Sequence, residues 1–241
     1  MDRKPQTGLF FLGLFIAVGL ATAGYYVGQT LYNAKVALNT AEVKGLAERR
    51  VKADRVNWTV SHWVSGKSRE EIPSLYQQAE KNQQTIIDLL KENGFDDQEI
   101  QIGVFNYQSQ EYRDENQKLV DQTHTLAGTI SIESSKVDQI TQVRSKVNKL
   151  IAQGIDIDNG TPAFRFTKLN EIKPEMLSEA TKNARIAANE FAKNAGVKVG
   201  GIRSATQGSF FIRDAGEEYG DTAKIDKDVR VVTTITFYLT D

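Results

Sequence analysis

The sequence contains no cysteine among its 241 residues. Disulfides, thiolate nucleophiles and thiolate metal sites are therefore excluded. Histidine is almost absent as well, since His62 and His124 are the only two. A metal site or an acid–base pair would need one or both of them together with carboxylates. Each lies in a predicted strand, where a histidine without a catalytic role is the commoner case, and the two can meet only if their strands are neighbours.

An excess of charge of either sign is also lacking. The chain has 30 Lys and Arg residues against 31 Asp and Glu, with a formal net charge of −1. Such a balanced chain produces no long-range field that would attract nucleic acid. No dinucleotide-binding, P-loop or nucleophile-elbow motif is present, so Gly200, Gly201 and Gly208 are interpreted as a bend or bulge in a strand. We expect no catalytic, cofactor-binding or metal-binding residues.

The N-terminal segment is the most informative part of the sequence. No charged side chain occurs from Pro5 to Ala34, and Gly8 to Val27 is almost wholly apolar. About 20 helical residues span roughly 30 Å, which is the thickness of a bilayer core. Arg3 and Lys4 precede the segment and tyrosines cluster at its far end. This pattern predicts a cytoplasmic tail over residues 1–7, a transmembrane anchor over residues 8–31 and an exported remainder.

Two alternatives concern this segment. Ala21-Thr22-Ala23 has the form that signal peptidase accepts, so cleavage after Ala23 is a competing interpretation, although the apolar run continues past it to Val27. Both interpretations export the domain. Gly24 and Gly28 are four residues apart and form a possible contact face between two such helices, whereas glycine is also common in membrane helices without that role.

Strand and helix periodicities alternate along the exported part. Asp54 to Ser65 alternates with period two, which places Val56, Trp58, Val60, His62 and Val64 on one face. A helix ending at Gly94, a hairpin of strands through Ile100–Val104 and Leu126–Ile132, a helix from Val137 to Leu150 and a strand with Phe164 and Phe166 follow. Residues 52–168 thus read β-α-β-β-α-β, the order of a split βαβ unit with two helices on one face of an antiparallel sheet.

An α-β-β segment follows. Pro174 suits the first turn of a third helix, whose expected apolar face is Leu177, Ala180, Ala184, Ala187, Phe191 and Ala195. Strands are predicted over Val197–Gln207 and Val229–Leu239. The predicted fold is α+β with antiparallel or mixed sheets. The tail either extends the first sheet or forms a second lobe, and we expect two lobes, at about 52–168 and 169–241.

Acidic residues crowd the loop before the last strand: Asp214, Glu217, Glu218, Asp221, Asp226 and Asp228. Carboxylates of this kind can hold calcium, but the spacing matches no calcium-loop template. We therefore expect a solvated, mobile surface loop.

Trp58 and Trp63 fall on opposite faces of one predicted strand. Core packing explains one of them, and the other is a candidate for contact with a second lobe or subunit. Trp58, Trp63, Gly24 and Gly28 are therefore the possible interface residues.

Several stretches resemble a known family. Val43-Lys44-Gly45-Leu46-Ala47-Glu48 is similar to its opening strand, and Phe166–Asn170 with Pro174-Glu175 is similar to its approach to a long helix. Ala180–Gly196, Gly200-Gly201-Ile202 and Val229–Leu239 fit as well. Over residues 41–241 the sequence resembles the SIMPL-domain family of bacterial envelope proteins, in its membrane-anchored branch. The resemblance implies a periplasmic α/β domain on the inner membrane, members that assemble into rings, some members linked to protection against oxidative stress, and no catalytic residues.

Three functional hypotheses follow. The first is a non-enzymatic, single-pass envelope protein that self-associates as a homo-oligomer and has a role in oxidative or envelope stress. The second is a periplasmic module that binds a small molecule or peptide between its lobes. The third is a metal-dependent enzyme, which would need His62 or His124 as a ligand.

Overall fold

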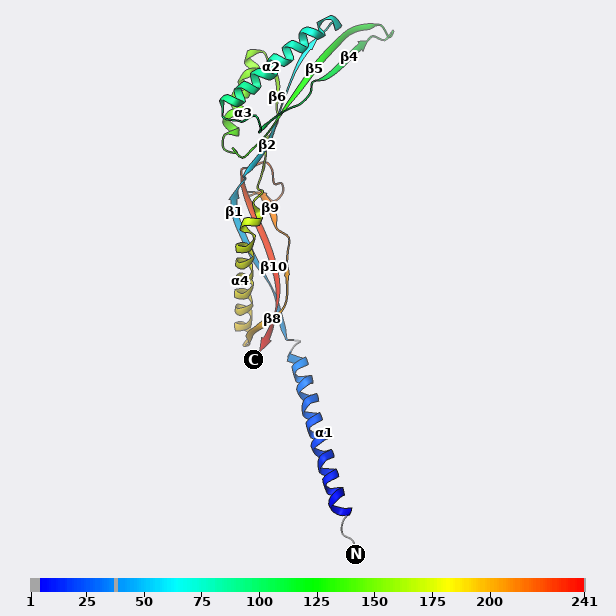
Figure 1. Cartoon of the computed structure of the whole chain (residues 1–241), viewed down its shortest axis with the longest axis vertical. Coiled ribbons are helices and arrows are strands. Elements are labelled where there is room, and N and C mark those ends of the chain that lie inside the picture. Colours follow the sequence, from blue (N-terminus) through cyan, green and yellow to red (C-terminus); the bar gives the residue numbers. More distant parts are fainter. Residues whose placement is uncertain (1–4, 37–38, 241) are drawn as a thin grey trace. The chain divides into compact units, whose positions relative to one another are not determined.

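The computed structural model describes residues 5–36 and 39–240, and it divides into two compact units (Figure 1). The first unit comprises the residues up to Ala47, Pro174–Phe210 and the residues from Val231 onward. The second comprises Glu48–Lys173 and Phe211–Arg230. The units therefore differ from the expected lobes at 52–168 and 169–241, because each is assembled from segments that are far apart in the sequence. Periodicity locates strands, but it does not show which distant strands pair.

Helix α1 (Pro5–Val36) contains the apolar segment of the N-terminus. Residues Gly8–Ala34 have a mean hydropathy of 1.9 and bury none of their surface against the rest of the chain. The segment is long and apolar enough to cross a membrane, as a signal sequence also is. The predicted N-terminal apolar helix is thus confirmed, and it continues beyond residue 31.

The first unit packs one helix on a sheet. The sheet has the order β1-β10-β8, formed by β1 (Thr40–Lys52), β10 (Asp226–Thr240) and β8 (Lys198–Gln207), and β8 is antiparallel to β10. Helix α4 (Leu169–Ala195) contributes Ala184 and Ala188 to a core with Ile235 and Phe237. A Cβ on Gly45 of β1 would lie 1.9 Å from the carbonyl oxygen of Ala180. Only glycine permits this close approach of helix to strand.

One expectation about α4 is wrong, and another is correct only for Ala180 and Ala184. The helix begins at Leu169, so Pro174 lies inside it and not in its first turn. Its buried residues are Met176, Ala180, Ala184, Ala188 and Ala192, whereas Ala187, Phe191 and Ala195 are exposed. The close approach at Gly45 places Ala180 and Ala184 against β1, and Phe191 then lies on the exposed side of the helix.

The second unit places two helices on one face of an antiparallel sheet, as predicted. Its sheet has the order β3-β5-β2-β6, with β4 also paired to β5 and β7 to β2. These strands are β2 (Arg55–Gly66), β3 (Ile100–Ile102), β4 (Asn106–Arg113), β5 (Leu119–Ser134), β6 (Asp156–Asn159) and β7 (Ala163–Arg165). The expected hairpin is present, but the sequence did not predict β4 as a separate strand or β6 at all. Strand β9 (Phe211–Asp214) pairs with the first residues of β10.

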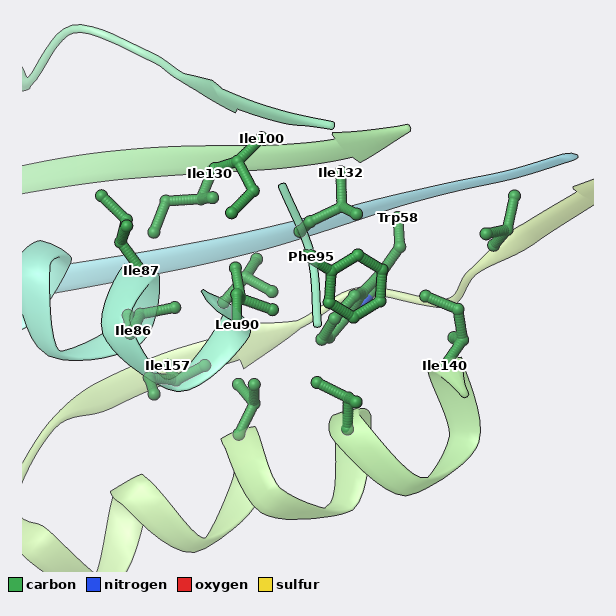
Figure 2. Close-up of a cluster of buried hydrophobic side chains, with 14 of the residues drawn as sticks. Trp58, Ile86, Ile87, Leu90, Phe95, Ile100, Ile130, Ile132, Ile140 and Ile157 are labelled. Carbon is green, nitrogen blue, oxygen red and sulfur yellow. The ribbon is translucent and has the colours of Figure 1, made fainter. Parts of the chain in front are cut away.

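Helices α2 (Ile72–Glu92) and α3 (Ile140–Lys149) supply the helical side of this core (Figure 2). Short 3₁₀ turns precede α2 (Arg69–Glu71) and follow α3 (Leu150–Gln153). Ile86, Ile87 and Leu90 of α2 pack with Trp58, Ile130 and Ile132 of the sheet. Val56, Trp58, Val60, His62 and Val64 are all buried, which confirms the face predicted from the period-two pattern. The opposite face of the sheet carries no helix in this unit.

Candidate interaction surfaces

The two tryptophans of β2 have different environments. Trp58 is 1% exposed within the core, and its Nε1 donates to Oδ1 of Asn159 at 3.0 Å. Trp58 is therefore a core residue, and the expectation that it could be an interface residue is wrong. Trp63 lies on the opposite face and is half-buried.

Gly24 and Gly28 lie in α1 with nothing within 4 Å of the position that a Cβ would occupy at either residue. A second helix can therefore approach this side of α1 closely. Their role as a contact face remains a prediction.

The strands that carry the two histidines are neighbours, but their register keeps the imidazoles apart. His62 is opposite Gly128 of β5, whereas His124 is opposite Gly66 of β2. Four residues of strand separate them, which is about 13 Å. Among the residues that the structure describes, no group of three or more His, Asp or Glu side chains is placed to hold a metal ion.

His62 is a fully buried imidazole. Its ring meets Phe105 edge-on at 5.9 Å between centroids, and a Cβ on Gly128 would lie only 2.5 Å from Nε2. Neither ring nitrogen has a hydrogen-bond partner within the described part of the chain. Burial lowers the pKa of His62, so the neutral form occupies this site.

His124 is also buried, but one of its nitrogens is satisfied. The hydroxyl of Tyr107 lies 2.8 Å from Nδ1, and the two rings stack with centroids 6.0 Å apart. The pair joins β4 to β5 at the base of the hairpin. This contact is structural and leaves His124 separate from any carboxylate cluster.

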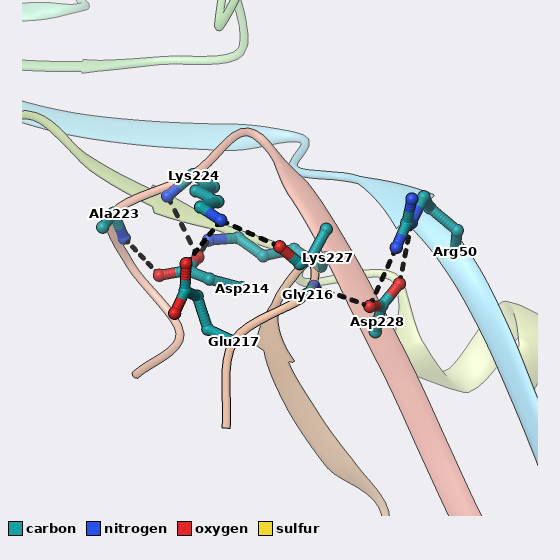
Figure 3. Close-up of polar contacts among 9 residues, drawn as sticks. Arg50, Asp214, Gly216, Glu217, Ala223, Lys224, Lys227 and Asp228 are labelled. Atoms are coloured by element: carbon teal, nitrogen blue, oxygen red, sulfur yellow. Dashed lines mark hydrogen bonds and ion pairs between the residues drawn. The ribbon is translucent and has the colours of Figure 1, made fainter. Parts of the chain in front are cut away.

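The acidic loop is organised by a buried ion pair (Figure 3). The side chains of Lys227 and Asp214 are 0% and 3% exposed, and Lys227 Nζ donates to Oδ1 of Asp214 and to the carbonyl oxygen of Asp221. Asp214 also accepts from the backbone amides of Ala223 (2.8 Å) and Lys224 (3.0 Å). Burial opposes ionisation of Asp214, but these hydrogen bonds outweigh it and keep its pKa below the ordinary value. The expectation of a solvated loop is wrong for Asp214, because the chain folds back over thirteen residues to pair it.

A second contact fixes the start of β10. Arg50 Nε donates to Oδ1 of Asp228 at 2.8 Å and its Nη2 donates to Oδ2 at 3.1 Å. The amide of Gly216 donates to the same carboxylate at 3.0 Å. The hydrogen bonds from Arg50 and Gly216 lower the pKa of Asp228.

These residues border a hollow of about 390 Å³, lined by Glu48, Phe211, Arg213, Gly216, Glu217, Glu218, Asp228 and Arg230. Four carboxylates (Glu48, Glu217, Glu218 and Asp228) and two guanidinium groups (Arg213 and Arg230) line it.

The feature that the sequence reasoning missed is the open edge formed by β3 and β4. Within the part of the chain that the structure describes, both strands pair with β5 alone. The amide of Gly103 between them donates to the carbonyl oxygen of Thr129 at 2.8 Å. Residues 103–105 lie opposite two residues of β5, so an extra residue separates β3 from β4 along this edge. Every residue of β4 is exposed, and Ile102, Val104 and Tyr107 are 57%, 92% and 45% exposed.

No charged side chain or proline occurs from Ile100 to Gln110. Native sheet edges are normally protected by charges, proline, bulges or short strands. The opposite edge consists of two short strands, β6 and β7, of four and three residues, with Pro162 between them. In the β3–β4 edge, β3 is equally short at three residues, but β4 has eight. Strand β8 carries Lys198 and Arg203, and its pairing with β10 is irregular. The uncharged run, which has high β propensity, could have indicated the open edge from the sequence.

An apolar N-terminal helix followed by an α+β domain with antiparallel sheets is thus the class of protein that the structure defines. The SIMPL family model, described as a protein of unknown function (DUF541), matches residues 41–237. The chain belongs to the SIMPL family, as the resemblance of its strands and long helix predicted. No curated protein matches the chain.

Proposed function

We propose that this protein is a non-enzymatic, single-pass protein of the bacterial inner membrane whose periplasmic domain self-associates. The open, uncharged edge from Ile100 to Gln110 supports the proposal most directly. Residues 1–7 lie in the cytoplasm, and the α+β domain follows the membrane helix on the periplasmic side. A role in oxidative or envelope stress protection belongs to the same proposal and is supported by the family resemblance.

The edge has the properties required for pairing with a second copy of itself. A twofold-symmetric antiparallel pair brings the same strand from both copies together. Like charges placed opposite each other destabilise such a pair, and this strand has none before Glu111. Backbone N–H and C=O groups along the edge find partners, and burial of exposed side chains such as Ile102 and Val104 contributes up to about 1.5–3 kcal/mol each.

The membrane helix assists this association. Confining two domains to one membrane surface raises their effective concentration, so a modest edge contact is sufficient. A contact between helices at Gly24 and Gly28 would add to it. The two contributions can be separated by mutation.

The first test is the mass of the full-length protein in detergent, measured by light scattering. We expect a defined oligomer for the wild type. The double variant Ile102→Lys/Val104→Lys places two charges on the edge and should give monomers. Ile202→Lys is the matched control, because Ile202 lies on β8 and is exposed to a similar extent, 52%. It should leave the oligomer intact.

A monomeric wild type, or an oligomer that the edge variant leaves unchanged, would contradict this function. Loss of the oligomer only in Gly24→Leu/Gly28→Leu would assign the association to the helix instead of the edge. Intact mass spectrometry of the same sample tests whether the chain is cleaved after Ala23, which would exclude the membrane anchor.

A further inference from the structure

The face of the second unit's sheet that lies opposite α2 and α3 has an unusual composition. Strand β2 contributes Asn57, Thr59, Ser61, Trp63 and Ser65 to it. The register places Ser131, Thr129 and Thr125 of β5 opposite Thr59, Ser61 and Ser65. We call this surface the polar face. Its hydrogen-bonding groups are hydroxyls and amides, not charged groups.

Charged side chains flank the central rows of the polar face. Asp121 and Glu133 lie near the two ends of β5, Asp156 and Asp158 of β6 lie opposite Trp63 and Ser61, and Arg55 of β2 lies opposite Arg165 of β7. Solvated protein surfaces are normally rich in lysine and glutamate. Lysine and glutamate are absent from the two central rows of the polar face, which run from Asn57 to Ser65 on β2 and from Thr125 to Ser131 on β5. The side chains of these rows are mostly short and leave much of the sheet surface uncovered. The central rows therefore offer no fixed charge of their own to an ionic ligand or to nucleic acid.

The hydrogen-bonding capacity of the polar face is largely unused. Ser65 Oγ lies 3.0 Å from Thr125 Oγ1. The side chains of Asn57, Thr59, Gln101 and Ser131 have no hydrogen-bond partner within the described residues. Together with Trp58, Ile132 and the charged Glu133, these residues line a hollow of about 130 Å³. Each hydroxyl group can donate and accept a hydrogen bond, and each side-chain amide donates through its nitrogen and accepts through its oxygen. A ligand with many hydroxyl groups can form hydrogen bonds of both kinds with these side chains.

Trp63 supplies a large apolar platform on the polar face, where Tyr112 of β4 is a second aromatic. The cross-strand neighbours of Trp63 are the small Ala127 on β5 and Asp156 on β6, so neither neighbour covers the half-buried indole with a larger apolar side chain. The row from Asn57 to Ser65 extends over about 27 Å, long enough for several consecutive sugar rings. An indole packs well against the C–H face of a sugar ring, while the ring hydroxyls reach the polar groups around it.

We infer that the polar face binds an uncharged polysaccharide chain, with Trp63 stacking on one sugar ring and the Ser, Thr, Asn and Gln side chains binding its hydroxyl or acetamido groups. The absence of charge from the central rows of β2 and β5 matches a neutral polymer. A peptide strand would instead add to a sheet edge, where backbone groups are open. This activity is independent of self-association at the β3–β4 edge.

The test is isothermal titration calorimetry of the full-length protein with chitohexaose and with cellohexaose. The protein is kept in a polyoxyethylene detergent, because sugar-headed detergents would compete. We expect saturable binding of at least one oligosaccharide, weakened at least tenfold by Trp63→Ala. Thr59→Lys is a second variant at an exposed position, and its long cation on the face should also weaken binding tenfold. Phe191→Ala removes an exposed aromatic from α4 and is the matched control that should bind normally.

No binding of either oligosaccharide, or binding that a folded Trp63→Ala and Thr59→Lys leave unchanged, overturns the inference. Dissociation of the oligomer by Thr59→Lys would also overturn it, because the polar face would then be a contact between copies. The edge variant Ile102→Lys/Val104→Lys should keep full oligosaccharide binding. The failure of the self-association proposal is therefore distinguishable from the failure of this one.

Discussion

The buried pair of Lys227 and Asp214 gives the sharpest prediction about stability. Replacing Lys227 by methionine keeps most of the side-chain volume but leaves the Asp214 carboxylate buried without its cation. Breaking a buried ion pair in this way typically costs about 3–5 kcal/mol. The amides of Ala223 and Lys224 continue to hold the carboxylate, so the lower part of that range is expected.

Lys224 provides the matched control within the same loop. Its ion pair with Glu217 is about half exposed, with side-chain exposures of 47% and 52%. Lys224→Met should therefore lower the free energy of unfolding by only roughly 0–1 kcal/mol. Both tryptophans lie in the second unit, so urea unfolding of the full-length protein followed by tryptophan fluorescence reports on the unit that contains this loop.

The pH dependence supplies an independent check. Asp214 has a lowered pKa in the folded protein, so its stabilising contribution is present above its ordinary value of 3.8 and is lost as the pH falls through the folded pKa. The difference between wild type and Lys227→Met should therefore shrink below about pH 3.8. The reasoning is refuted if Lys227→Met costs no more than Lys224→Met at neutral pH.

Two further predictions concern the cores. Gly45→Ala forces a Cβ to within 1.9 Å of the Ala180 carbonyl oxygen, so it should lower the free energy of unfolding by about 3 kcal/mol or more. Thermal unfolding followed by circular dichroism measures this loss. Gly201→Ala is the control and should be nearly neutral, because nothing lies within 4 Å of the position of its Cβ. His62 has a pKa lowered from its ordinary value of 6.5, so the unfolded chain takes up its proton at a higher pH than the folded chain. Stability should therefore fall below about pH 6.5 by up to about 1.4 kcal/mol per pH unit and level off below the folded pKa, as measured by urea unfolding. An identical slope in His62→Leu between about pH 5 and pH 6.5 would show that another group is responsible.

Much of the second unit could be predicted because its signals are local. The alternation from Val56 to Val64 identifies a strand with one buried face, whatever that strand pairs with. The apolar N-terminal helix is likewise a property of composition over one continuous segment. The helix α4 shows the limit, because several apolar rows run along its surface and the contact at Gly45 decides which row is buried.

The candidate surfaces could not be predicted in full, because they depend on contacts between residues that are distant in the sequence. The sequence placed His62, His124, Trp58 and Trp63 in strands, but the register between β2 and β5 separated the histidines and put Trp58 in the core. It also showed an uncharged run from Ile100, without showing that the run forms a sheet edge.

By itself, the sequence determined the apolar N-terminal helix, the order of most elements, the buried face of β2 and the family. Only the tertiary structure decided the composition of the two units, the pairing of Lys227 with Asp214, the row of α4 that packs on β1 and the strand left at the edge. The physical reason is how far apart along the chain the interacting residues lie. Side-chain periodicity reports the environment of a segment through its near neighbours, whereas register, edges and buried pairs are set by residues that are distant in the chain and close only after folding.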